Sequence, residues 1–205
     1  MNKATFLFIG FLATFASAWF GLALIPAAHY TQVARAAPAG VMADVELIDR
    51  GRQVYMANGC IYCHSQQVSP SHFRSDQARG WGNRRTVAAD YDNDKVALLG
   101  TMRTGPDLAN IGVRNPSASW HYMHLYDPQL TSPGSIMPPF RFLFERRKAT
   151  PGAPSPNVIT LGGNPVQPDG TEIVPSDEAR ALIAYLLALN HGKVDRPEAF
   201  EPPAK

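Results

Sequence analysis

The sequence has little cysteine: Cys60 and Cys63 are the only two. There is therefore no four-cysteine zinc site and no framework of several disulfides. Basic character is also slight, since the formal net charge is +2 and no Lys/Arg run contains interleaved aromatic residues. Without a basic surface that would follow a phosphate backbone, we expect no nucleic-acid partner.

Recognisable catalytic motifs are missing as well. The sequence has no Walker loop, no Ser/His/Asp set in a supporting motif and no carboxylate pair in a recognisable site. We therefore expect no bond chemistry on this chain. Its 205 residues suffice for one domain and an additional segment.

That additional segment begins the chain. Residues 4–25 are 22 residues without a charge, and as a helix they are long enough to cross a hydrocarbon core of about 30 Å. A cleaved secretory signal is the alternative, because Lys3 precedes the run and residues 34–36 resemble a cleavage site. Signal cores have only about 7 to 15 apolar residues, which favours a retained anchor in contact with membrane lipid.

The predicted domain organisation follows from these composition changes. We expect a transmembrane anchor at residues 1–30, whose helix ends at Pro26 because proline lacks the backbone donor. Residues 31–44 are small and polar and predict a linker. The folded domain is expected at residues 45–195 and a C-terminal tail at 196–205.

The two cysteines belong to the motif C-x-x-C-H, formed by Cys60, Cys63 and His64. This is the pattern of covalent haem attachment, in which two thiols add to the two vinyl groups of one porphyrin and the imidazole reaches the iron. A redox disulfide is the alternative, but it is typical of a motif at the start of a helix. Here an amphipathic helix is predicted before the motif, ending at residues 58–59.

A haem ligated by His64 needs a second axial ligand, and methionine is a common partner. Met137 is the best candidate, because it lies in the segment S-I-M-P-P, where two prolines stiffen a short loop. His121 and His124 are the alternative, which would give a bis-histidine haem, although hydrogen-bonded structural histidines are the more common case. We predict one covalent haem c with iron ligated by His64 and Met137.

Residues 45–140 resemble class I cytochrome c domains, on the evidence of the haem motif, the segment R-T-G-P-D-L-A-N-I-G-V-R at 103–114 and the S-x-M-P loop. The resemblance implies that the Pro106 carbonyl accepts the N–H of His64, that Leu108 packs on the haem and that Arg114 binds a propionate. The implied fold class is mainly α, with a single N-terminal transmembrane helix followed by a class I cytochrome c domain with loop insertions.

Longer segments make the resemblance narrower. GRQVYMANGCIYCHSQ, RTGPDL, WHYMHLYDP and SIMPPFRFLFERR occur in this order behind the anchor, and residues 4–145 resemble subunit II of cbb3-type cytochrome c oxidases. The resemblance implies an electron-transfer subunit of an oxidoreductase complex. Its partners would be an integral-membrane catalytic oxidase subunit and, as electron donor, another cytochrome c subunit or a soluble cytochrome c.

Two other functions are compatible with parts of this pattern. The mono-haem cytochrome c subunit of nitric oxide reductase also combines one anchor with one haem c. A haem-based gas sensor would need a labile Met137, and the sequence has no fused signalling domain. Because bacteria attach haem covalently outside the cytoplasm, we expect a single-pass protein of the bacterial inner membrane with a periplasmic haem domain.

Three further stretches lie outside the haem motifs. Between His64 and Pro106 lie 41 residues, an insertion with several arginines, Trp81 and three aspartates at 90, 92 and 94, which is either a solvated loop or a contact to a propionate or a partner. Residues 151–175 contain six prolines and predict a short β-hairpin or an extended loop. A last helix is expected after Ser176, which would cap it. The resemblance to class I cytochrome c domains implies that this helix crosses the first domain helix at Gly51.

Overall fold

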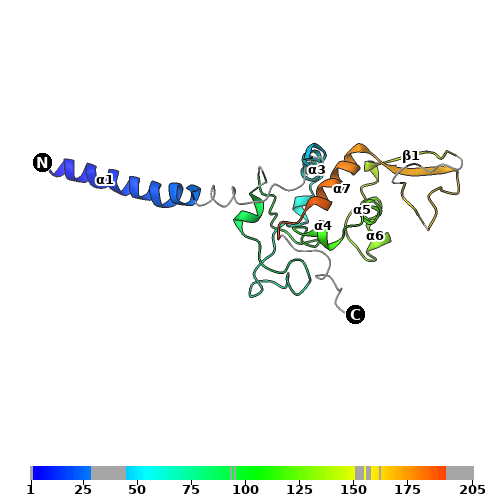
Figure 1. The fold of residues 1–205 in the computed structure, drawn as a ribbon, viewed down its shortest axis with the longest axis horizontal. Coiled ribbons are helices and arrows are strands. Elements are labelled where there is room, and N and C mark those ends of the chain that lie inside the picture. The colour runs from blue at the N-terminus through cyan, green and yellow to red at the C-terminus, as the bar shows by residue number, and fades with distance from the viewer. Residues whose placement is uncertain are drawn as a thin grey trace. The chain divides into compact units, whose positions relative to one another are not determined.

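The computed structural model describes residues 2–28, 45–92, 94, 96–150, 155, 158–161 and 163–192. The predicted linker at 31–44 and the predicted tail at 196–205 lie outside these residues. The described residues belong to two units: residues 2–28 with 87–92 and 94 form one, and the remainder form the other. Figure 1 shows the course of the chain.

The N-terminal apolar run is helical, as expected. Helix α1 (Lys3–Trp19) continues through a π-helical turn, η1 (Phe20–Leu24), and the helix extends to Ala28 (Figure 1). An 18-residue stretch of the helix Lys3–Ala28 has a mean hydropathy of 2.0 and is not buried, so the helix is long and apolar enough to cross a membrane.

The prediction that Pro26 ends this helix is wrong. The residue before it, Ile25, donates its N–H to the carbonyl of Phe20, one residue further back than in an α-helix. Such a wide turn leaves room for the proline ring, which in a regular α-helix would clash with the carbonyl four residues earlier. Helical structure therefore continues past the proline.

Helices α3 (Val45–Ala57) and α7 (Asp177–Ala188) form the core of the second unit and pack against each other (Figure 1). Gly51 permits their close approach: a Cβ there would lie 1.8 Å from the Ala181 carbonyl oxygen and 2.8 Å from the Tyr185 Cβ. The sequence therefore predicted this crossing correctly. The ring centroids of Tyr55 and Tyr185 are 5.5 Å apart, which adds an aromatic contact to it.

The ends of both helices are set by local sequence. Ser176 caps α7 by accepting a hydrogen bond from the Ala179 N–H at 3.2 Å, as expected for an N-cap serine. Helix α3 ends one turn before the haem motif, and Gly59 follows it with a left-handed φ of 70°. This glycine reverses the chain direction so that the next residues turn back toward the domain.

Short helices and turns fill the rest of the described chain. They are η2 (Cys60–Tyr62), η3 (Ala88–Tyr91), α4 (Ile111–Arg114), α5 (Ala118–Tyr126), α6 (Pro128–Thr131) and η4 (Arg141–Leu143). Helix η3 belongs to the unit that contains α1. The described structure is thus mainly helical with one N-terminal apolar helix, as predicted, and a class I cytochrome c domain is consistent with it.

The only strands among the described residues form a two-stranded antiparallel sheet, β1 (Phe144–Lys148) with β2 (Thr171–Pro175). The hairpin expected within 151–175 is present as a short one, since Val166 forms an antiparallel bridge with Glu172 and the Gln167 N–H donates to the Thr171 carbonyl at 2.7 Å. The longer partner of β2 is β1, which lies before that stretch. Residues 158–161 contribute a single backbone bond, from the Ile159 N–H to the Ile173 carbonyl at 2.9 Å. The prolines remove the donors that a longer ladder would need.

Candidate haem site

The turn after α3 carries the haem motif. The Cys63 and His64 N–H groups donate to the Cys60 carbonyl at 3.1 and 2.9 Å, which closes the motif into one tight turn. Both cysteine side chains and the imidazole line the same cavity. Local hydrogen bonding thus brings the three predicted attachment residues to one side of the chain.

The His64 ring is oriented from the opposite segment. Its Nδ1 lies 2.7 Å from the Pro106 carbonyl oxygen, and because a carbonyl only accepts, Nδ1 carries the proton and Nε2 offers its lone pair. Burial lowers the pKa of His64, while the Pro106 bond opposes this, so the ring is neutral at pH 7. A neutral imidazole with its other nitrogen engaged is the form in which histidine ligates metals.

Gly105 makes this approach possible. A Cβ at residue 105 would lie 2.3 Å from Cε1 and 2.8 Å from Nε2 of His64, well inside contact distance. The Gly105 N–H also donates to the Cys63 carbonyl at 2.9 Å. The loop therefore lies directly against the imidazole, and a larger residue would displace the ring.

A cavity of about 790 Å³ opens beside this loop, and all the residues predicted from the sequence line it. They are Cys60, Cys63, His64, Pro106, Leu108, Arg114 and Met137. Tyr55, Leu182 and Leu186 of the two core helices also line the cavity, so its walls are largely apolar. An apolar pocket with a few polar groups is typical of a cofactor site.

Met137 lies on the side of the cavity formed by residues 132–140. It is half-buried and packs against the hydrophobic core, and its N–H donates to Ser135 Oγ at 3.2 Å. The neighbouring Phe140 N–H donates to the Leu125 carbonyl at 2.8 Å, which ties the end of the loop to helix α5. The thioether thus comes from a chain segment 73 residues after His64.

Arg114 provides the cationic group of the cavity. Its Nη2 donates to the Asp107 carbonyl at 2.7 Å, whereas Nη1 is buried without a hydrogen-bond partner among the described residues. Burial lowers the pKa of Arg114 to about 10, which still leaves it charged at pH 7. A buried guanidinium with an unused donor needs an anion, and a propionate fits this requirement.

The thiols themselves argue against a redox disulfide. Burial raises the pKa of Cys60 to about 11, whereas the reactive cysteine of a disulfide oxidoreductase has a lowered pKa. The motif also follows helix α3 and lies in the 3-10 turn η2, not at the N-terminus of an α-helix. The donor set of two thiols, one neutral imidazole and one thioether around an apolar cavity therefore fits a haem.

The two alternative histidines also line the cavity. His121 is buried and its Nε2 lies 2.9 Å from the Asn115 carbonyl oxygen, so that nitrogen is already engaged. His124 is stacked on Trp120, with ring centroids 4.6 Å apart, and its Nδ1 lies 2.6 Å from Thr131 Oγ1. Burial lowers the pKa of His124 to about 4, helped by the charges of His121 and His64. Both rings therefore have structural partners.

Within residues 67–100 of the insertion, Trp81 lines the cavity, whereas none of the arginines in that range does. Arg79 and Arg103 lie over the Trp81 ring, with guanidinium carbons 5.3 and 5.5 Å from the ring centroid. The Trp81 carbonyl accepts from Asn110 Nδ2 at 2.8 Å. No role for Arg103 was predicted from the sequence, although a charged residue directly before the turn Thr104-Gly105-Pro106 indicated one.

The helical fold and this cavity are consistent with a haem-binding protein of the cytochrome c class. The family model described as cytochrome c oxidase, mono-heme subunit/FixO, matches residues 2–159. The chain therefore belongs to this family, which implies one haem and membership in a membrane oxidase complex. Among curated proteins, no sequence matches the chain. The family match agrees with the resemblance that the sequence motifs indicated.

Proposed function

We propose that the chain is the electron-transfer subunit of a cbb3-type haem–copper oxidase and passes single electrons to the catalytic subunit. The observation that carries the proposal is the convergence of Cys60, Cys63, His64 and Met137 on one cavity. The family match supports an oxidase subunit, and the N-terminal helix supports a membrane anchor. Haem c bound here would supply one-electron transfer.

In this proposal the residues of the cavity divide into three roles. Cys60 and Cys63 would hold the porphyrin through thioethers, and His64 and Met137 would ligate the iron. Pro106 fixes the imidazole, which raises its basicity as a ligand. Leu108 packs on the porphyrin face and Arg114 neutralises a propionate through its unused Nη1. With both axial positions taken, the site favours electron transfer over binding of a gas.

The domain organisation and location follow the same proposal. Residues 1–30 anchor the chain in the bacterial inner membrane, residues 31–44 link the anchor to the domain, and residues 45–195 form the periplasmic haem domain, followed by a tail at 196–205. Electrons would arrive from another cytochrome c subunit or a soluble cytochrome c. Purification of the chain together with a copper-containing membrane protein would support this assignment. Purification with a partner that contains non-haem iron would instead indicate nitric oxide reductase.

The ligand assignment is tested by Met137→Leu in the full-length protein purified from membranes. We expect the variant to keep its covalent haem, shown by haem staining on a denaturing gel, but to bind carbon monoxide in the reduced state. Met102→Leu is the matched control, because Met102 is 55 % exposed and does not line the cavity. A wild-type protein whose reduced spectrum shifts fully with carbon monoxide would contradict electron transfer and support a gas sensor.

A further inference from the structure

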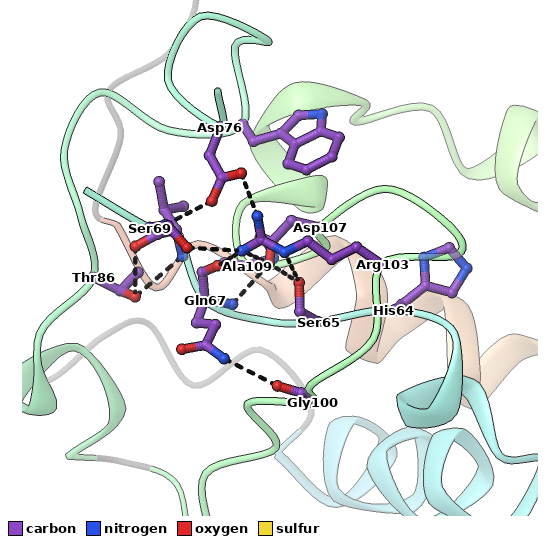
Figure 2. Close-up of polar contacts among 12 residues, drawn as sticks. His64, Ser65, Gln67, Ser69, Asp76, Thr86, Gly100, Arg103, Asp107 and Ala109 are labelled. Carbon is purple, nitrogen blue, oxygen red and sulfur yellow. Dashed lines mark hydrogen bonds and ion pairs between the residues drawn. The ribbon is translucent and has the colours of Figure 1, made fainter. Parts of the chain in front are cut away.

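Arg103 is a largely buried cation outside the haem cavity. Its side chain is 11 % exposed and lies between two carboxylates, those of Asp76 and Asp107, which are 2 % and 0 % exposed. Arg103 Nη1 pairs with Asp76, and its Nη2 lies 3.7 Å from Asp107 Oδ2 (Figure 2). Buried charges are costly unless paired and hydrogen-bonded, so this arrangement is constrained to one geometry.

The same guanidinium joins two chain segments. Arg103 Nε donates to Ser65 Oγ at 2.8 Å, and Nη2 donates to the Gln67 carbonyl at 2.5 Å (Figure 2). Asp107 adds bonds from the Ser65 hydroxyl and the Gln67 N–H, at 2.6 and 2.8 Å. These bonds hold the residues that follow His64 against the loop that starts at Arg103.

The loop held in this way carries the acceptor for the imidazole. Arg103 and Asp107 flank Pro106, whose carbonyl lies 2.7 Å from His64 Nδ1. The Leu108 N–H closes the far end of the loop with a 2.7 Å bond to the Ser65 carbonyl. Movement at either flank would therefore change the position of the Pro106 carbonyl relative to the ring.

The insertion supplies the third member of the network. Asp76 lies in the insertion and accepts from the Ser69 N–H at 2.6 Å as well as from Arg103. Burial alone would raise the pKa of Asp76, but its bonds to Arg103 and Ser69 lower it below the usual value, so it is ionised at pH 7. The part of the insertion around Asp76 thus has a structural connection to the haem loop.

We propose that Arg103 is a positioning residue, which together with Asp76 and Asp107 holds the Pro106 carbonyl against the proximal His64 imidazole. The inference rests on the proposed function in so far as His64 is the proximal ligand. The hydrogen bond at Nδ1 raises the basicity of an imidazole ligand, which favours the oxidised iron. Loosening the network therefore raises the midpoint potential without changing the axial ligands.

Arg103→Lys tests this most directly, because it keeps the charge but removes the planar fork that makes several bonds at once. The matched control is Arg79→Lys, the same change at an exposed arginine that lies over the same Trp81 ring and whose side chain, among the described residues, hydrogen-bonds to Ser75. We expect a higher midpoint potential in Arg103→Lys and no shift in Arg79→Lys. An equal shift in both variants, or in neither, would overturn the proposal.

A second measurement follows the hydrogen bond itself. We expect the His64 Nδ1 proton to exchange with solvent about tenfold faster in Arg103→Lys than in wild type, as measured by NMR, since a bond of ordinary strength restricts exchange by roughly that factor. If Arg103→Lys does not fold, Asp76→Asn serves instead, with the same expectation for exchange. Unchanged exchange in the variant that folds would contradict the positioning role.

These readouts separate the inference from the proposed function. Proton exchange is measured on the full chain as purified, so it reports on the network whether or not His64 binds iron. Wild-type protein without covalent haem would contradict the proposed function alone. Protein with covalent haem but with unchanged exchange in Arg103→Lys and Asp76→Asn would contradict the positioning role alone.

Discussion

On the His64 side of the cavity, residues 63–69 and 103–109 are joined by buried hydrogen bonds and ion pairs, whereas on the Met137 side residues 132–140 rely on prolines and a few bonds. The first side includes the fully buried carboxylate of Asp107 and is bonded to the buried carboxylate of Asp76, whereas the second side contains no charged residue. The difference indicates that the imidazole is held by a network whose members depend on one another. The Met137 thioether lies in a local loop, where we expect substitutions to cost less free energy of unfolding.

Both sides of the cavity adjoin the helix pair α3 and α7. A substitution that separates these two helices should therefore destabilise both sides together and cause the largest loss in the free energy of unfolding. Gly51→Leu places side-chain atoms where even a Cβ would be 1.8 Å from the Ala181 carbonyl oxygen. We expect a loss of at least about 3 kcal/mol in the free energy of unfolding. Gln53→Leu, on an exposed part of the same helix, is the control. Thermal unfolding of Gly51→Leu at the wild-type temperature would show that this crossing is wrongly assigned.

A matched pair of glycines tests the two sides separately. Gly105→Ala introduces a Cβ 2.3 Å from His64 Cε1, whereas Gly134 has no atom within 4 Å of its hypothetical Cβ and has only a positive φ of 82°. We expect losses of about 3 kcal/mol for Gly105→Ala and about 1 kcal/mol for Gly134→Ala. Chemical denaturation of the haem-containing chain measures both. Equal losses would contradict the contrast between the two sides.

Removing a single hydrogen-bonding group should also destabilise the protein more on the His64 side than on the Met137 side, but by less than the glycine substitutions. Asp107→Asn removes the charge that accepts from Ser65, Gln67 and Ala109, and should cost about 2 to 3 kcal/mol. Ser135→Ala removes one bond to the Met137 N–H and should cost about 0.5 to 1 kcal/mol. The free energy of unfolding of each variant measures this, and a larger cost at Ser135 would reverse the comparison.

Lowering the pH should weaken the hydrogen-bond network on the His64 side and leave the Met137 loop unchanged. We expect this to be the smallest of the effects on stability. The bonds from Arg103 and Ser69 lower the pKa of Asp76, so its stabilisation is complete above its unfolded value of about 4 and is lost as pH falls through the lower folded value. Hydrogen exchange at the Ser69 amide should therefore accelerate below about pH 4 in wild type and change less in Asp76→Asn. The Phe140 amide should respond equally in both proteins, and an unequal response there would contradict the prediction.

Much of the site was predictable from the sequence because its signals are local. The spacing of Cys60, Cys63 and His64, the helix end at Gly59 and the cap at Ser176 each depend on a few neighbouring residues. The crossing at Gly51 was implied by the resemblance to class I cytochrome c domains, and the structure has it. The end of the N-terminal helix was wrong because a single wide turn accommodates Pro26.

The residues that the insertion contacts could not be predicted from such local signals. Sequence composition left its arginines as either solvated or functional, and the hairpin stretch had several possible pairings. In the structure the decisive cation is Arg103, outside the cluster that the sequence suggested, and its partner Asp76 lies 27 residues earlier. Strand β2 pairs with 144–148, which was not expected to form a strand.

The sequence by itself determined the attachment motif, the apolar helix and the family, because these depend on residue type and short spacing. Only the tertiary structure decided which residues hold the Pro106 carbonyl against His64. The bonds from Arg103 to Ser65 and Asp76 join residues that are 38 and 27 positions apart in the sequence. Each buried charge is stable in the interior only when all of its hydrogen-bonding and ion-pair partners are in place. Such a cooperative, long-range condition leaves no periodic trace in the sequence.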